Sequence, residues 1–200
     1  LSMGGGCEVF PYAFLGGRTQ DKKWQGDDAP IEIGEKNTFR EFTTLHPATF
    51  ADRKTTIGYG NLFCAYSHIG HECHVGDACV FSNNATLGGH VIVGDHVVIG
   101  GLTAVHQFCH IGSGAMIGGC CKLLQDVIPR MLAEGYPASH KTINKVGLRR
   151  AGFSEDDIQV VARIFRLVFR GGLNRPQAIA QLRAGALGDH PFIEEAVHFL

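Results

Sequence analysis

Imidazole side chains gather in the middle of the sequence, in an arrangement that could carry proton transfer. His68 and His71 lie three residues apart, and Glu72 follows His71 directly. A neutral imidazole can remove a proton from a hydroxyl or an amine near pH 7, and an adjacent carboxylate can orient the ring and stabilise the imidazolium. Farther along, Gly88 and Gly89 offer backbone N–H groups to a developing oxyanion. These residue types indicate a candidate general-base site.

The same histidines fit a second chemistry, which is the binding of zinc by three imidazoles with an open position for water. His90 and His106 provide further ring nitrogens downstream, and Gln107 follows His106. The spacing along the chain is compatible with either chemistry, so both interpretations stay open at this point.

A six-residue repeat must position these side chains. Twelve large apolar residues follow one another at this spacing: Ile57, Phe63, Ile69, Val75, Phe81, Leu87, Val93, Ile99, Val105, Ile111, Ile117 and Leu123. A smaller residue stands two positions before each of them, and residues two apart in a strand share a face. Large and small side chains therefore alternate on one inward face. This pattern predicts a parallel β-helix of triangular section with about 18 residues per coil.

Stacking of such coils would bring the histidines together. At about 18 residues per coil, Ile69, Leu87 and Val105 lie above one another at the strand spacing of about 4.8 Å. The histidines flank these three residues, so we expect them at one shared corner. A residue directly before an apolar position points outward, which predicts His68 on the outer surface.

Glycine and cysteine take regular places in the repeat. Glycine directly follows eight of the twelve apolar residues, where we expect the chain to turn a corner and to exclude a Cβ. Five of the seven cysteines occupy the small inward position, and we interpret them as packing residues: Cys7, Cys73, Cys79, Cys109 and Cys121. The odd number of cysteines and the absence of a Cys-x-x-Cys spacing argue against a zinc ribbon and against a disulfide framework. The reducing cytoplasm fits this usage best.

Two polar stretches interrupt the repeat. Residues 18–30 and 46–56 leave the six-residue pattern, although the spacing resumes in register after each of them. We expect loops that project from the coils. The sequence does not say whether these loops replace sides of a coil or are inserted between them.

A different pattern follows the repeat. The six-residue spacing ends near residues 125–129, and a helix is predicted to open at Ser154, where Asp157 completes a near capping box. Shorter helices are expected near residues 176–185 and 191–200. We therefore predict two parts: a β-helix with projecting loops over residues 1–128 and a C-terminal helical domain over residues 129–200.

The composition gives no sign of nucleic-acid binding, of a membrane span or of a secretory signal. The formal net charge of -1 does not suggest binding to nucleic acid. Charge is uneven, because residues 1–129 carry 8 Lys/Arg against 12 Asp/Glu and residues 130–200 carry 10 against 7. No run approaches the ~18 apolar residues of a membrane span, and the start of the sequence lacks the charged and apolar regions of a secretory signal.

With these residues in view, the sequence resembles the family of UDP-N-acetylglucosamine O-acyltransferases that begin lipid A synthesis. The similarity extends over nearly all of the 200 residues. Its most specific segments are residues 20–24 (QDKKW), 67–73 (SHIGHEC), 83–90 (NNATLGGH), 103–109 (TAVHQFC) and 147–154 (GLRRAGFS). The six-residue spacing is common to many transferases, whereas these segments together are far more specific.

The resemblance implies a left-handed coil and a homotrimer with active sites between neighbouring β-helices. His71 would be the general base that deprotonates the sugar 3-hydroxyl, Glu72 would support it, and the Gly89 N–H would stabilise the oxyanion. The acyl donor would be a 3-hydroxyacyl chain on acyl carrier protein, and no cofactor or metal is implied.

The resemblance also implies a set of binding residues. Sugar and acyl chain would be positioned by residues of the first loop and of the histidine corner: Gln20, Asp21, Lys23, His68, His90, His106 and Gln107. Asn144 and Arg150 would hold the nucleotide. Gly119 matches the residue that limits acyl length, where glycine leaves the groove open for a longer chain.

Four features depart from the family pattern. Compared with the family, about three N-terminal coils are absent from this sequence. Glu72 stands where an aspartate is expected, Val146 where an acidic ribose contact is expected, and Pro137 where a histidine is often found.

Three alternative functions remain to be weighed. A related N-acyltransferase of the same pathway carries a separate N-terminal uridine-binding domain that is not visible here. A β-helical carbonic anhydrase would bind zinc through stacked histidines. A non-catalytic trimerising module would leave the histidine corner unexplained.

Overall fold

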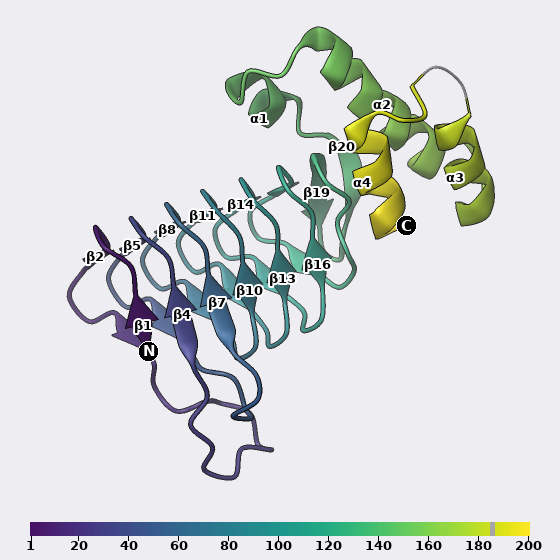
Figure 1. The fold of residues 1–200 in the computed structure, drawn as a ribbon. Coiled ribbons are helices and arrows are strands. Elements are labelled where there is room, and N and C mark those ends of the chain that lie inside the picture. Colours follow the sequence, from purple (N-terminus) through teal and green to yellow (C-terminus); the bar gives the residue numbers. More distant parts are fainter. Residues whose placement is uncertain (185–186) are drawn as a thin grey trace.

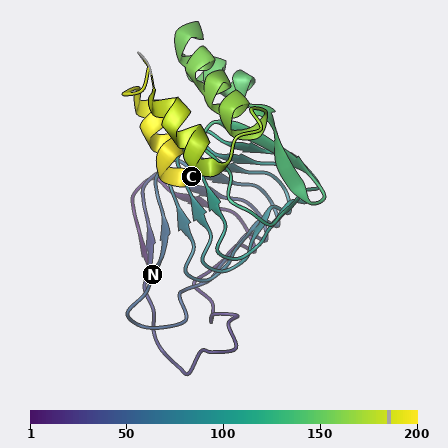
Figure 2. The same cartoon turned by 90° about the vertical axis from the view of Figure 1, so that its right-hand side faces the viewer.

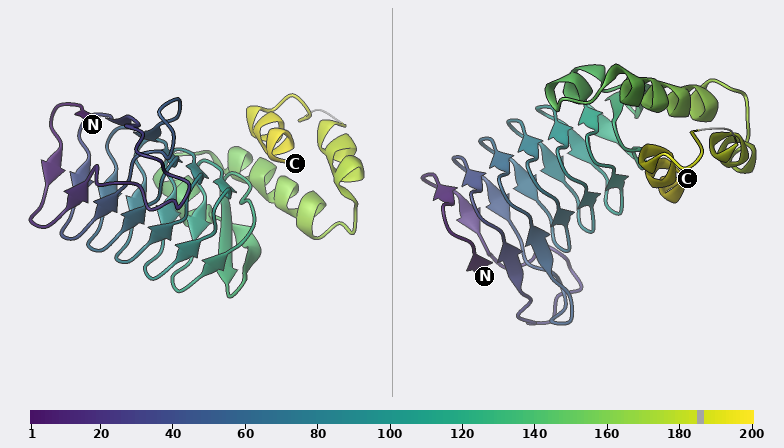
Figure 3. Two further views of the ribbon diagram at one scale, coloured as in Figure 1. Left: turned by 90° about the horizontal axis from the view of Figure 1, so that it is seen from below. Right: turned by 45° about the horizontal axis from the view of Figure 1, so that its top comes forward.

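The protein is a left-handed parallel β-helix with a small helical region at its C-terminal end, as predicted. The structure is a computed structural model, and it describes residues 1–184 and 187–200. Figure 1 shows the strands standing in rows that advance from the N-terminus toward helices α2, α3 and α4. The two views of Figure 3 place the N-terminal coil at one end and these helices at the other.

Short parallel strands form the three sides of the coil, one sheet to a side. Sheet A contains β1 (Ser2–Met3), β4 (Ile31–Ile33), β7 (Thr55–Ile57), β10 (His74–Val75), β13 (Ile92–Val93) and β16 (His110–Ile111). Sheet B contains β2 (Glu8–Val9), β5 (Thr38–Phe39), β8 (Leu62–Phe63), β11 (Val80–Phe81), β14 (Val98–Ile99), β17 (Met116–Ile117), β19 (Met131–Gly135) and β20 (Ala138–Ile143). Sheet C contains β3 (Phe14–Leu15), β6 (Thr44–Leu45), β9 (His68–Ile69), β12 (Thr86–Leu87), β15 (Ala104–Val105) and β18 (Lys122–Leu123).

The strand register decides what the two polar stretches do. Residues paired across neighbouring coils are normally 18 apart, as in Val75 and Val93. Met3 pairs with Ile33 across the first polar stretch, 30 residues on. Ile33 pairs with Ile57 across the second, 24 residues on. Both stretches are therefore insertions of 12 and 6 residues at the corner between sheets C and A, and no side of a coil is lost. Figure 1 shows them projecting beyond β1, β4 and β7.

The inward column of large residues forms a continuous core. Phe39, Phe63 and Phe81 are fully buried, with ring centroids 4.9 and 4.8 Å apart along the stack. Aromatic rings at this spacing add to the stability that burial of their area provides. The stacked rings thus connect three successive coils on the inner face of sheet B.

The inward cysteines are packing residues, as predicted. Cys73, Cys79, Cys109 and Cys121 are buried, and Cys7 is partly buried. Burial raises the pKa of the Cys73 and Cys79 thiols to about 12 and that of Cys109 to about 11. These thiols stay protonated near neutral pH and so lack the thiolate that a nucleophile needs.

The glycines after the apolar positions serve a different purpose from the one we expected. Left-handed backbone conformations recur three residues after nearly every apolar position, for example at Glu72 with φ 53° and Asn84 with φ 61°. The glycines at the first position after it are needed for close packing of coils instead. A Cβ on Gly70 would lie 2.8 Å from the carbonyl carbon of Gly88 on the next coil. Most corners are turned by residues that carry side chains, and Gly60 and Gly114 are exceptions.

The C-terminal part begins with strands, which the sequence pattern does not predict. β19 pairs in parallel with β17 and extends sheet B by one strand, and β20 folds back on β19 as a hairpin. The exposed edge of sheet B satisfies the backbone groups of β19, and this is why the segment is extended although the six-residue spacing has ended. The boundary near residue 128 stays a prediction.

In the described part of the chain, four helices follow the hairpin: α1 (Lys145–Arg150), α2 (Glu155–Phe169), α3 (Arg175–Arg183) and α4 (Pro191–Phe199). The last three confirm the predicted helices, except that residue 185, the predicted end of the second of them, lies outside the described residues. Ser154 and Asp157 form the capping box at the start of α2, which fixes where that helix begins. Figure 2 shows the helices gathered over one end of the coils, away from the projecting loops. Among the described residues, no helix has both the length and the apolar character needed to cross a bilayer.

Candidate active site

The candidate site occupies the corner at which sheet C passes into sheet A. Glu72, His90 and Phe108 stand at the same place on three successive coils, and each adopts a left-handed backbone with φ of 53°, 61° and 66°. This conformation aims the three side chains along one edge of the triangular coil. The coil geometry therefore brings together residues that are 18 positions apart in sequence.

His71 and Glu72 form the centre of the site. His71 Nδ1 contacts Glu72 Oε2, and the two side chains are 16% and 4% exposed. A carboxylate only accepts hydrogen bonds, so the contact selects the imidazole tautomer with the proton on Nδ1. Nε2 then carries the free lone pair. This is the arrangement that a general base requires.

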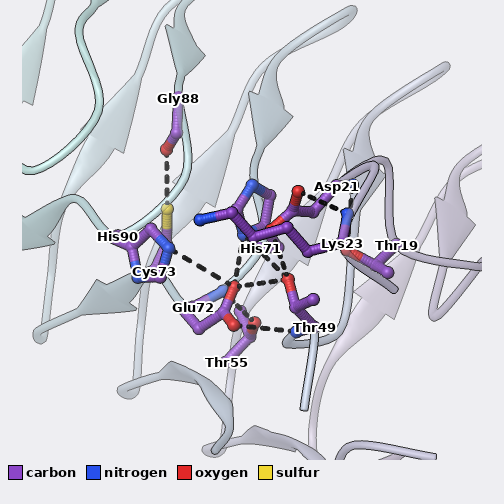
Figure 4. Close-up of polar contacts among 10 residues, drawn as sticks. All are labelled: Thr19, Asp21, Lys23, Thr49, Thr55, His71, Glu72, Cys73, Gly88 and His90. Atoms are coloured by element: carbon purple, nitrogen blue, oxygen red, sulfur yellow. Dashed lines mark hydrogen bonds and ion pairs between the residues drawn. The ribbon is translucent and has the colours of Figure 1, made fainter. Parts of the chain in front are cut away.

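The buried carboxylate of Glu72 is held by a residue of the second inserted loop. Thr49 donates its backbone N–H to Glu72 Oε1 at 2.8 Å, and its hydroxyl oxygen lies 3.3 Å from Oε2. The backbone N–H of Glu72 donates to Thr55 Oγ1 at 3.0 Å. Figure 4 shows Thr49 between Glu72 and Asp21. The sequence does not single out Thr49, because one threonine in a polar loop gives no signal of its own.

The first inserted loop contributes Asp21. Its Oδ2 accepts a hydrogen bond from Thr49 Oγ1 at 3.0 Å, and its Oδ1 accepts the backbone N–H of Lys23 at 3.0 Å. The Lys23 hydrogen bond is the main reason that the pKa of Asp21 lies below its ordinary value. Gln20 and Lys23 are exposed beside it. The structure thus brings Asp21 to the predicted site, with Gln20 and Lys23 at its edge.

His90 closes the other side of the site. Its ring meets that of His71 edge to face with centroids 5.1 Å apart, and it stacks on Phe108 at 4.5 Å. His90 Nε2 lies 3.9 Å from Glu72 Oε2. Burial lowers the pKa of His90, which favours the neutral ring.

His68 is half-buried and is less exposed than its outward position suggested. Its Nδ1 lies 2.7 Å from Thr44 Oγ1, and its ring lies 5.4 Å from that of His46 in the second inserted loop. Burial, followed by the neighbouring His46 and His71, lowers the pKa of His68 to about 4. His68 is therefore a neutral hydrogen-bonding group at neutral pH.

Gly89 lies directly against the His71 ring. A Cβ built on Gly89 would collide with His71 Cε1 and Nε2. Among the residues that the structure describes, no backbone acceptor binds the Gly89 N–H. Gly89 therefore offers an available backbone N–H donor, and its lack of a Cβ leaves room for the imidazole ring of His71.

The remaining predicted site residues lie apart from His71. His106 and Gln107 are exposed on the coil beyond His90, and His106 Nδ1 lies 3.0 Å from the Gln107 carbonyl oxygen. Gly119 is exposed after β17, where a Cβ would lie 3.3 Å from the Gly101 carbonyl oxygen.

Asn144 and Arg150 lie on a different side of the molecule. They line a cavity of about 700 Å³ against Val98, Met116 and Leu132, the outward residues of sheet B. Asn144 also caps α1 by accepting the Gly147 N–H at 3.0 Å. In a three-sided coil, sheet B faces away from the corner between sheets C and A. One chain therefore does not bring these two residues to His71.

The three-imidazole zinc site is not what the corner forms. Among the described residues, the one group with suitable ligand atoms within 4.8 Å of one another is His71, Glu72 and His90. It contains two imidazoles and a carboxylate, and that carboxylate already accepts hydrogen bonds from Thr49. The arrangement fits base catalysis better than a site of three stacked histidines.

Known proteins with related sequences show which family this chain resembles. A family model described as "Udp N-acetylglucosamine O-acyltransferase; Domain 2" matches residues 126–200. The acyl-[acyl-carrier-protein]–UDP-N-acetylglucosamine O-acyltransferase of Paraburkholderia phymatum is 46% identical over 185 residues, which cover 90% of this chain and 71% of that protein. Its counterpart from Gloeothece citriformis is 36% identical over 198 residues, which cover 99% and 71%.

Solved structures give the same relationship. The UDP-N-acetylglucosamine O-acyltransferase of Moraxella catarrhalis superposes with a TM-score of 0.92 at 38% identity, covering 98% of this chain and 76% of that one. The UDP-N-acetylglucosamine acyltransferase of Bacteroides fragilis gives 0.94 at 34% identity, covering 98% and 77%.

Proposed function

The chain belongs to the UDP-N-acetylglucosamine O-acyltransferase family, and we propose that it transfers a 3-hydroxyacyl chain from acyl carrier protein to the 3-hydroxyl of UDP-N-acetylglucosamine. This is the first step of lipid A synthesis, and it assigns the protein to the cytoplasm, where the carrier is found. The observation that carries the proposal is the pairing of His71 Nδ1 with buried Glu72, which leaves Nε2 free to accept a proton.

The proposed reaction moves one proton through His71. Nε2 takes the proton of the sugar 3-hydroxyl as the oxygen attacks the thioester carbonyl carbon. The carbonyl oxygen becomes an oxyanion, to which the Gly89 N–H donates. The intermediate then expels the carrier thiolate, which takes the proton from the imidazolium. Glu72 stays anionic throughout and stabilises the positive ring.

The other site residues are assigned to substrate binding. Asp21 lies beside the base and suits a hydrogen bond from a sugar hydroxyl, with Gln20 and Lys23 next to it in the same loop. His68 and His90 are neutral donors and acceptors on either side of His71. His106 and Gln107 are assigned to the acyl chain and the sugar on the following coil.

A homotrimer would complete the site. Asn144 and Arg150, the proposed nucleotide contacts, lie over sheet B, whereas His71 lies at the opposite corner. A cyclic trimer can place sheet B of one protomer against the His71 corner of the next. Val146 lines the same cavity, where the family pattern led us to expect an acidic side chain, so the proposed ribose contact would not be made by residue 146.

Mixed trimers test this arrangement. His71→Ala and Arg150→Ala should each be inactive alone, and co-expression should restore activity at the roughly one site in four that keeps both residues if subunits mix at random. Mixed trimers that stay inactive would contradict a site shared between protomers.

The acyl carrier is proposed to approach along the C-terminal helices. A cavity of about 900 Å³ extends from Gln107 and Phe108 to Lys141, Arg170 and Arg175. Its basic rim suits an acidic carrier, and its inner end reaches the ring that stacks on His90. Gly119 is proposed to leave the acyl groove open, so a bulky residue there should shorten the preferred chain.

The function is tested with purified protein, UDP-N-acetylglucosamine and 3-hydroxyacyl carriers of graded length. We expect transfer with one preferred length, and His71→Ala should lose nearly all of it. His198→Ala, on the exposed face of α4, is the matched histidine control. Near-normal transfer by His71→Ala would overturn the mechanism. Acylation of an amino-sugar nucleotide in place of the 3-hydroxyl would favour the related N-acyltransferase.

A further inference from the structure

The second inserted loop buries a hydroxyl group at the heart of the site. Thr49 lies between β6 and β7 and is 0% exposed. Its Oγ1 lies 3.0 Å from Asp21 Oδ2, 3.3 Å from Glu72 Oε2 and 3.4 Å from His71 Nδ1. No other residue in Figure 4 touches all three of these groups. The family resemblance assigned no role to this threonine.

A hydroxyl has one proton to donate, and this limits what Thr49 can do. Both Asp21 and Glu72 offer only acceptors when they are ionised, so the Thr49 O–H serves one carboxylate at a time or is shared between them. Its oxygen also lies 3.4 Å from His71 Nδ1, whose proton is donated to Glu72 Oε2. The backbone N–H of Thr49 is committed separately to Glu72 Oε1. The hydroxyl is therefore a direct link between the sugar-binding loop and the carboxylate behind the base.

The two inserted loops are also joined at a second point. His46 Nδ1 lies 3.0 Å from the Arg18 carbonyl oxygen, which ties the start of one loop to the start of the other. With both ties present, the position of Asp21 depends on the position of Thr49. A shift of one loop is then transmitted to the orientation of Glu72.

We propose that Thr49 is a positioning residue that couples Asp21 to the Glu72–His71 pair through its hydroxyl group. The proposal rests on the proposed function of His71 as the base. Thr49 does not touch the reacting atoms. It keeps the buried carboxylate oriented toward Nδ1, and it communicates the presence of a ligand at Asp21 to that carboxylate.

The test compares Thr49→Val with Thr49→Ser. Valine keeps the shape and the backbone N–H but removes the hydroxyl, so we expect kcat to fall about 10- to 100-fold through misplacement of the base. KM for UDP-N-acetylglucosamine should change by less than about threefold, because the Lys23 N–H still holds the Asp21 carboxylate in Thr49→Val. Serine restores the hydroxyl and should recover most of the lost rate. Thr43→Val is the control. It removes a buried hydroxyl that is hydrogen-bonded to Ser67 and that precedes β6, whereas Thr49 follows β6, so this variant should keep the unsubstituted rate.

A double-mutant cycle separates coupling from a general structural role. If Thr49 acts through Glu72, Thr49→Val should cost less than about threefold in kcat when Glu72 is already replaced by Gln. If the fold decreases in kcat of the two single variants multiply in the double variant, the substitutions act independently and the proposal is overturned. A Thr49→Val enzyme with unchanged kcat would overturn it as well.

An observation independent of turnover keeps this inference distinct from the proposed function. In protein labelled with ¹⁵N-histidine, the nitrogen signals of His71 should change in Thr49→Val and return in Thr49→Ser. If the unsubstituted protein transfers no acyl group, the proposed function fails, and these signals still decide whether Thr49 positions the His71–Glu72 pair. Identical spectra for all three proteins would exclude that role.

Discussion

Two corners of the same coils share one backbone conformation and differ in their side chains and in how exposed these are. The corner between sheets B and C carries Tyr12, Phe42, Tyr66, Asn84, Leu102 and Cys120, all exposed and all with positive φ. We call this the bare corner. The corner between sheets C and A carries Glu72, His90 and Phe108 with the same conformation, and we call it the loop-covered corner.

The difference follows from the inserted loops. Tyr66 and Glu72 are neighbouring corner residues with φ of 65° and 53°, yet Tyr66 is 54% exposed and Glu72 is 4% exposed. Exposure rises again along the loop-covered corner, from Glu72 through His90 to Phe108, as the coils move away from the loops. The regular coil thus places a row of side chains along one corner, and the inserted loops shield the end of that row at Glu72 from solvent.

Removal of the second inserted loop should have the largest effect, because it would expose the loop-covered corner. Deletion of residues 48–53 takes out six residues and restores the 18-residue spacing between paired strands. We expect the coils to form, Glu72 to become exposed, and transfer to fall by about 10³-fold because the base loses its oriented carboxylate. Transfer assays and circular dichroism of the purified variant check both parts.

A control of unchanged length accompanies the deletion. Replacing exposed Ala51 and Asp52 by glycine should leave most of the activity, since neither side chain is buried in the site. A deletion variant that keeps transfer within tenfold of the unsubstituted rate would show that the loop is dispensable.

Gly89→Ala tests whether the loop-covered corner needs open space beside the base. The added methyl group would collide with the His71 ring. We expect the ring to shift and kcat to fall about 100-fold, with the thermal midpoint little changed. Gly5→Ala is the matched control, because a Cβ there meets no atom within 4 Å. Equal kcat in both variants would contradict the assigned packing.

Acid should destabilise the loop-covered side through His68. Its pKa is about 4 in the folded protein because of burial, whereas an unfolded histidine has a pKa of about 6.5. The unfolded state therefore binds more protons between these values, so the stabilising contribution is present above pH 6.5 and is lost as pH falls toward 4. His140, whose pKa burial also lowers to about 4, adds a similar contribution.

Denaturant unfolding measured from pH 7 to pH 4 checks this expectation. His68→Gln should reduce the slope of the free energy of unfolding against pH, and exposed His198→Gln should not. A slope unchanged by His68→Gln would contradict burial of the neutral ring.

Substitution at the bare corner should have the smallest effect. Tyr66→Ser removes one member of the Phe42–Tyr66 stack, whose ring centroids lie 4.8 Å apart. We expect a loss of about 1 kcal/mol in the free energy of unfolding and a transfer rate within about twofold of the unsubstituted rate, because no site residue is touched. A large loss of transfer would show that both corners contribute to the reaction.

Much of the fold could be predicted because the repeat is local and strict. The alternation of large and small residues at period six specifies strand, face and coil length together, and this spacing alone predicts His68, His71 and His90 at one corner. The hairpin β19–β20 was not predicted, because it is held by the edge of sheet B and not by a pattern of its own.

The glycines show where a correct pattern received an incomplete explanation. Their regular spacing was evident, but the sequence cannot distinguish a residue that turns a corner from one that allows the next coil to approach. Only the three-dimensional structure shows that Gly70 meets Gly88 while Glu72 turns the chain.

The sequence by itself determined the coil, its 18-residue stacking and the set of side chains at each corner, because a periodic chain repeats the same local geometry. The tertiary structure decided which corner is shielded, which nitrogen of His71 is free, and that Thr49 holds Glu72. The shielding of the corner and the hold of Thr49 on Glu72 depend on two non-periodic loops, whose contacts join residues more than 20 positions apart. No local preference specifies such contacts, so they emerge only when the packed chain brings the loops back onto the coil.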